Sequence, residues 1–132
     1  MAIFKDINYL AVLICALIYF FIGFIWYSVL FGKLWAKEMG VAIPDKPQIF
    51  PLVGQFLSTF LYTLGIAVMI KMYGTPGICN GILIGLLVTI FFVIPINSGN
   101  LVFAGRTKLF FIDVSERAVG SIVTGIILSI WI

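Results

Sequence analysis

The side chains that could most readily take part in binding or catalysis lie close together near the C-terminal end of this sequence. Asp113, Glu116 and Arg117 interrupt an apolar stretch that covers residues 108–132. Asp113 and Arg117 are four residues apart, so on a helix they share one face and can form an ion pair. Glu116 is then left over, and the cluster carries a net charge of −1 (one cation, two anions). A proton, a cation or a basic side chain from the preceding loop must balance that charge.

Several kinds of chemistry are excluded by composition. The chain has no histidine, which removes His-ligated zinc or haem and every Ser-His or Cys-His catalytic pair. Cys15 and Cys79 fall in apolar runs without the spacing of a metal site. Asp113 and Glu116 are three apart on one helix, and one of them is expected to be paired. We therefore expect no enzyme activity, no cofactor and no metal.

The composition is that of an integral membrane protein. Apolar residues make up 63% of the 132 residues and charged residues 10%, against about 25% charged in soluble domains. The mean hydropathy is +1.24. The net charge of +3 is spread along the chain without a basic run, so no nucleic-acid binding is expected. The lipid bilayer is the first partner that the sequence predicts.

Four apolar stretches are long enough to cross a membrane, since a hydrocarbon core of about 30 Å needs roughly 20 helical residues. The expected transmembrane helices are residues 7–31, 52–72, 78–96 and 109–132. Together they predict an all-α integral membrane bundle of four transmembrane helices in a single domain, residues 1–132.

The segments that connect the spans contain helix-breaking residues. A short interfacial helix is expected around Trp35, after which Pro44, Pro47 and Pro51 forbid a continuous helix. Pro95 is expected to kink or end the third helix.

Orientation in the membrane follows from the basic residues beside the spans. Two lie in the N-terminal tail and the second connection, namely Lys5 and Lys71. Five lie in the first and third connections, namely Lys33, Lys37, Lys46, Arg106 and Lys108. The excess predicts a multi-pass protein of the cell membrane with both termini on the non-cytoplasmic side.

When the residues of each span are placed around a helix at 100° per residue, the polar residues cluster on one side. On three of the four spans they occupy one face, which must turn away from lipid. The residues expected to line a binding site or pathway are Tyr19, Trp26, Gln55, Tyr62, Asp113, Glu116, Arg117 and Thr124. Gly23 and Gly120 fall on the same faces.

Small residues recur every four positions on the last two spans. The stripes are Gly81 and Gly85, then Ser121, Gly125 and Ser129. This spacing lets helix backbones approach closely. It does not say whether the contact is within one subunit or between two.

The charged cluster has two interpretations that the sequence leaves open. The apolar remainder from Ala118 to Ile132 spans about 22 Å as a helix, less than the hydrocarbon thickness, so part of the charged turn must enter the membrane. It then either lines a site for an ion or small solute, or forms an interfacial ion-pair network that fixes the fourth helix against the first and second.

A longer pattern resembles a known family. The stretch "GFIWYSVLFGKLWAKEMG", Gly23 to Gly40, and the closing stretch "NLVFAGRTKLFFIDVSERAVGSIVTGIILSIW" resemble small bacterial membrane proteins of domain of unknown function 1761. The resemblance implies four helices in the same places and no established activity. Where that family often shows a Gly-Tyr-His-like run, this chain has Ser115, Glu116 and Arg117, so no role for a histidine carries over.

Two functions of different classes follow as hypotheses. The first is a small channel or transporter for an ion or small solute, expected to be a homo-oligomer because four helices enclose little volume. The alternative is an accessory or assembly subunit that binds other membrane proteins or lipid, with the charged cluster purely structural.

Overall fold

The computed structural model describes residues 2–40, 49–74 and 77–131, and every regular element within these ranges is a helix. This confirms the all-α prediction for that part of the chain. Pro44, Pro47 and Lys46 lie outside the described residues. The elements are α1 (Ala2–Lys5), α2 (Tyr9–Phe24), η1 (Ile25–Leu30), α3 (Gly32–Met39), α4 (Ile49–Tyr73), α5 (Ile78–Val88), η2 (Thr89–Val93), α6 (Ile94–Val102) and α7 (Thr107–Trp131).

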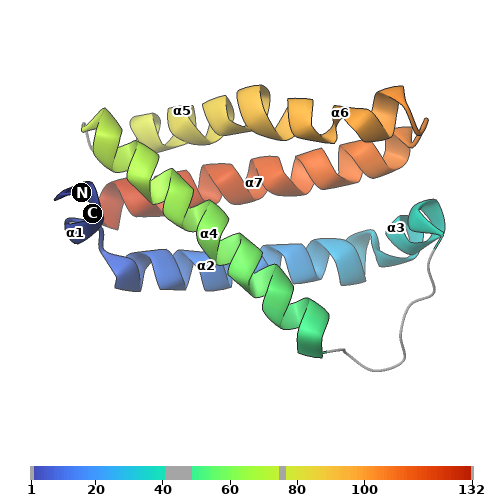
Figure 1. Ribbon diagram of the computed structural model, residues 1–132, viewed down its shortest axis with the longest axis horizontal. Coiled ribbons are helices and arrows are strands. Elements are labelled where there is room, and N and C mark those ends of the chain that lie inside the picture. Colours follow the sequence, from blue (N-terminus) through green and yellow to red (C-terminus); the bar gives the residue numbers. More distant parts are fainter. Residues whose placement is uncertain (1, 41–48, 75–76, 132) are drawn as a thin grey trace.

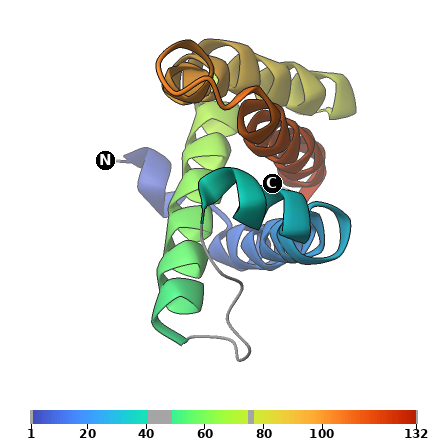
Figure 2. The ribbon, with the colours of Figure 1, turned by 90° about the vertical axis from the view of Figure 1, so that its right-hand side faces the viewer.

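Three helical segments run side by side: α2 with η1, α5 with α6, and α7 (Figure 1). Helix α4 crosses them at a steep angle. Both termini lie at one end of the bundle, and α3 and the turn from α6 to α7 lie at the other. Viewed from that second end, α3 lies in front of α2 and α4, with α7 beside it (Figure 2).

Within the part of the chain that the structure describes, three helical stretches are long and apolar enough to cross a membrane: Tyr9–Leu30, Ile49–Tyr73 and Ile78–Val102. The fourth long helix, α7, has 25 residues but is not among these three. Large apolar side chains cover the outside, with Phe50 88%, Val29 71% and Phe91 64% exposed. So much exposed apolar surface marks a contact with lipid or with another protein.

The first long helix starts at a cap. Asn8 has an extended backbone, and its Oδ1 accepts a hydrogen bond of 3.2 Å from the backbone N–H of Ala11. Such a side chain satisfies an N–H that lacks a partner within the helix. From Ile25 the helix widens into the π-helical segment η1.

The third long helix extends further than the sequence suggests. The sequence predicts an end near Ile96 and a kink or an end at Pro95, yet helical structure continues to Val102. Pro95 stands in the first turn of α6, directly after the π-helical η2. The missing N–H of proline is tolerated at a helix start, and the altered pitch of a π segment makes such a junction possible. Pro51 is accommodated similarly, in the first turn of α4.

The small-residue stripes meet each other within one chain. A Cβ added to Gly85 would lie 2.8 Å from Ile122 Cα and 2.8 Å from Ser121 O. A Cβ on Gly81 would lie 2.5 Å from Ser129 Oγ. Helices α5 and α7 therefore pack backbone against backbone, which confirms the expected close approach and answers the question of where it occurs.

The buried side chains in the half of the bundle nearer the termini are mostly apolar. They come from α2, α4, α5 and α7 and include Val12, Cys15, Ile66, Ile84 and Leu128. Val12 and Leu128 are 0% exposed. This packed half, which we call the apolar plug, closes the bundle at that end.

Candidate functional site

A cavity of about 590 Å³ occupies the other half of the bundle. Its walls come from α2, η1, α3, α4, α6 and α7. The volume falls in the range of sites for small ligands, roughly 300–1,000 Å³. The cavity lies towards the end where α3 and the start of α7 meet, since Trp35, Met39, Arg106 and Leu109 are among its walls.

Five of the eight side chains expected to line a site do line this cavity. They are Tyr19, Gln55, Asp113, Glu116 and Arg117. The other three, Trp26, Tyr62 and Thr124, are not among its lining residues. Thr124 is 1% exposed within the packed half. The Trp26 ring lies against Phe31, with centroids 5.4 Å apart, and its Nε1 is buried without a hydrogen-bond partner.

Asp113 has a partner on another helix. The hydroxyl of Tyr27 in η1 donates a hydrogen bond of 2.7 Å to Asp113 Oδ1. The sequence predicts an ion pair between Asp113 and Arg117, but among the described residues Arg117 pairs with Glu116 instead. The prediction was wrong because Arg117 extends towards Glu116 and α4, and the Tyr27 hydroxyl takes its place beside Asp113.

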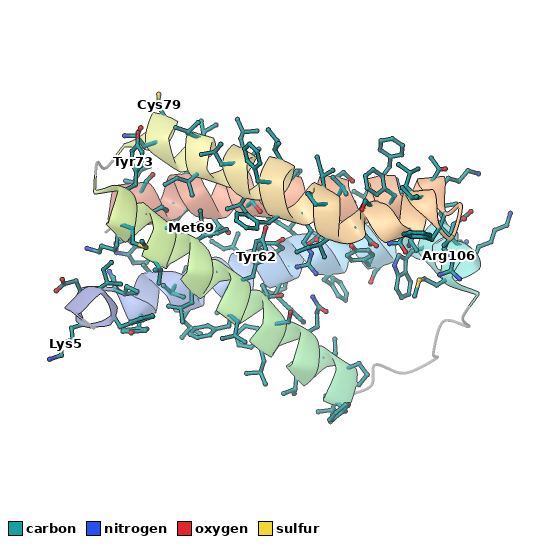
Figure 3. The ribbon with its side chains drawn as sticks, turned by 45° about the horizontal axis from the view of Figure 1, so that its top comes forward. Lys5, Tyr62, Met69, Tyr73, Cys79 and Arg106 are labelled. Carbon is teal, nitrogen blue, oxygen red and sulfur yellow. The ribbon has the colours of Figure 1, made fainter. Side chains whose placement is uncertain are left out.

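Arg117 lies among charged and aromatic groups at the inner end of the cavity. Its Nε is 3.7 Å from Glu116 Oε2, and its Cζ lies 5.7 Å from the centroid of the Tyr62 ring. The Tyr62 hydroxyl shares a hydrogen bond of 2.6 Å with Ser121 Oγ. Figure 3 places Tyr62 midway along α4, on the side that faces the bundle. We call Tyr19, Tyr62, Glu116 and Arg117 the charged layer.

The Tyr19 ring meets the Tyr62 ring edge to face, with centroids 5.6 Å apart. Arg117 lies beside the Tyr19 hydroxyl, but no hydrogen bond of ordinary geometry joins them, and this buried hydroxyl has no partner.

Two glycines make room for this layer. A Cβ on Gly23 would lie 3.3 Å from Glu116 Oε1, and a Cβ on Gly120 would lie 2.6 Å from Tyr19 Cε1. Glu116 is 3% exposed and Tyr19 is 2% exposed. The glycines thus bring α2 and α7 close enough to bury a carboxylate and a phenol between them.

Several cavity residues were not anticipated from the sequence. Asn97 and Asn100 line it from α6, a segment expected to be a loop. They are three apart and so share a helix face, a signal that is readable only once the segment is known to be helical. Arg106 lines the cavity at the start of α7, at the end where α3 lies (Figure 3).

A hydroxyl deletion tests the bond across helices. Tyr27→Phe removes the donor to Asp113 and is expected to cost about 1–2 kcal/mol, because a partly buried carboxylate loses a hydrogen bond. The measurement is the free energy of unfolding in detergent. Tyr9→Phe is the matched control, because the Tyr9 hydroxyl bonds Phe4 O in an exposed setting. Equal losses in both variants would contradict a stabilising role for Tyr27.

Within residues 2–40, 49–74 and 77–131, no group of three or more acidic or cysteine side chains is placed to hold a metal ion. The side chains that line the cavity include carboxylates, guanidinium groups, phenols and amides.

The fold and the site define a small helical protein whose apolar exterior surrounds a charged cavity. Residues 10–129 match the family described as "Protein of unknown function (DUF1761)". The chain belongs to that family, which confirms the resemblance seen in its sequence. No match was found among curated proteins or among solved structures.

Proposed function

We propose that the protein crosses the cell membrane four times and is a non-enzymatic transporter of a small polar solute, with the cavity as its binding site. The fourth crossing would be α7, whose 25 residues make a helix of about 37 Å. Both termini lie at the same end of the bundle, as an even number of crossings requires. The charged side chains Asp113, Glu116 and Arg117 of α7 line the cavity, and charged groups within a membrane are expected to turn away from lipid in this way.

The observation that carries the proposal is a charged cavity that is closed at one end. Asp113, Glu116 and Arg117 line it within a bundle of apolar helices, and the apolar plug fills the bundle beyond them. A channel needs a continuous path, whereas a transporter exposes its site to one side at a time. The one-sided cavity favours the transporter.

The orientation of the cavity follows from the positive-inside rule. Lys33, Lys37, Arg106 and Lys108 lie at the end that holds α3 and the start of α7. In the proposed topology this end faces the cytoplasm, so the cavity is accessible from the cytoplasm and both termini are outside.

Cysteine labelling tests whether the cavity is filled with water. In a Cys79→Ser background, the remaining native thiol, Cys15, is 1% exposed. Ser28→Cys places a thiol on the cavity wall. Val29→Cys places one on the neighbouring residue, which is 71% exposed but is not a lining residue of the cavity.

For protein reconstituted in lipid, a charged methanethiosulfonate reagent is expected to modify Ser28→Cys much faster than Val29→Cys. The reason is that a thiol reacts as its thiolate, which requires water. Slow labelling at both positions would mean that no hydrated cavity exists in the membrane, and the proposed function would fail.

A further inference from the structure

The cavity combines aromatic walls with buried acidic groups. Five aromatic side chains line it, namely Tyr19, Phe20, Phe24, Tyr27 and Trp35. Two carboxylates, Asp113 and Glu116, line the same space. Aromatic faces attract cations, and more strongly where water is excluded. A carboxylate beside aromatic rings is thus a suitable environment for an organic cation.

Among the described residues that line the cavity, two buried groups lack close partners. Glu116 is 3% exposed, and its one ion pair, to Arg117 Nε, is 3.7 Å long. Charge-assisted N–H···O bonds are normally about 2.7–2.9 Å long. The Tyr19 hydroxyl is buried beside Arg117, but it has no hydrogen-bond partner of ordinary geometry among the described residues. Buried polar groups are nearly always paired, so the Glu116 carboxylate and the Tyr19 oxygen are both available to accept hydrogen bonds from a ligand.

The basic residues of the cavity do not form an anion site. Arg117 already lies beside Glu116 and over the ring of Tyr62. Arg106 stands at the start of α7, where its Nη1 approaches Met39 Sδ at 3.9 Å. Among the described lining residues, Arg106 at the entrance offsets one of the two acidic groups, and the charged side chains further inside are Asp113, Glu116 and Arg117. Counted over these three residues alone, the inner part of the cavity carries one excess negative charge.

We propose that the cavity binds a small protonated amine with an apolar or aromatic body. Its ammonium N–H groups bond Glu116 and the Tyr19 oxygen, its charge offsets the excess negative charge, and its body lies against the aromatic walls. This inference rests on the proposed function, since it names the class of solute for the same cavity.

Calorimetry with three matched probes tests the charge preference. Full-length protein in lipid nanodiscs is titrated with benzylammonium, benzyl alcohol and benzoate, and empty nanodiscs provide the blank. The three probes share a ring and differ in the charge of the head group. Benzylammonium is expected to bind roughly tenfold or more tightly than the other two, as a charged hydrogen bond is worth.

Two variants assign the binding to its residues. Glu116→Gln is expected to weaken benzylammonium binding by roughly tenfold or more, and Tyr19→Phe by several-fold. Glu38→Gln, an acidic residue of α3 that is not among the lining residues, is expected to bind as the unaltered protein does. Protection of the buried Cys15 thiol from labelling checks that each variant is folded.

Tighter binding of benzoate, equal binding of all three probes, no binding of any probe, or unchanged binding in folded Glu116→Gln would each overturn the inference. The proposed function stands or falls separately, because rapid labelling of Ser28→Cys supports a hydrated site whatever these probes do.

Discussion

Gly125→Ala is expected to destabilise the protein by more than about 2 kcal/mol, because it forces apart two helices that touch through their backbones. The added Cβ would clash with the carbonyl oxygen of Gly81 and lie 3.0 Å from its carbonyl carbon. A side chain can rotate away from such a contact, whereas a backbone carbonyl can retreat only if the whole helix moves. Separating α5 from α7 would also disturb the contacts that Gly85 and Ser129 make between these helices.

Gly54→Ala is the matched control, since a Cβ on Gly54 would meet nothing within 4 Å. Alanine is the better helix former by about 1 kcal/mol, so this variant is expected to be as stable as the native protein or more stable. The two identical substitutions thus differ in sign.

The measurement uses the native thiol of Cys15, which is 1% exposed, in a Cys79→Ser background. A thiol-reactive dye labels Cys15 only when the bundle opens, so the midpoint of labelling on heating follows unfolding. Equal midpoints for the two glycine variants would show that α5 and α7 do not pack as closely as described.

The close packing of α5 on α7 could be predicted because it depends only on the spacing of small residues along each helix. Small residues four apart on each span lie on one face whatever the rest of the chain does. The polar faces were predictable for the same reason, and Tyr19, Gln55 and the charged cluster do meet at one cavity.

Trp26 shows where that periodicity stops working. At 100° per residue it shares a face with Tyr19, but the π-helical segment η1 begins at Ile25. A π segment bonds residues five apart instead of four, so each following side chain is turned relative to the expected face. Tyr27 consequently lines the cavity and Trp26 does not.

The partner of Asp113 was also beyond reach of the sequence. The rule that joins residues four apart considers a single helix, whereas the Tyr27 hydroxyl comes from a residue 86 positions away. Only the packing of α2 and α3, which flank η1, against α7 brings the two together. Pairings of this kind depend on tertiary structure, which local spacing does not encode.

Arg117→Leu is expected to cost about 2–3 kcal/mol, because it leaves the Glu116 carboxylate without its counter-charge. The Glu116 side chain is 4% exposed and that of Arg117 is 28% exposed, so solvent compensates for little of the loss at the carboxylate. Arg106→Leu is the control. Its weak contact with Met39 at the cavity entrance predicts a small change, since exposed charges contribute little.

The double variant Glu116→Gln with Arg117→Leu distinguishes two sources of the destabilisation. One is the loss of the favourable contacts of Arg117, and the other is the cost of leaving the buried Glu116 carboxylate unpaired. If the cost of Arg117→Leu comes from a buried, unpaired carboxylate, neutralising Glu116 should restore much of the stability, so the double variant is expected to unfold at a higher temperature than Arg117→Leu alone. The coupling energy from the cycle of single and double variants measures the pair directly. Additive losses, with no recovery in the double variant, would mean that Arg117 stabilises the bundle through its contact with the Tyr62 ring and not by neutralising Glu116.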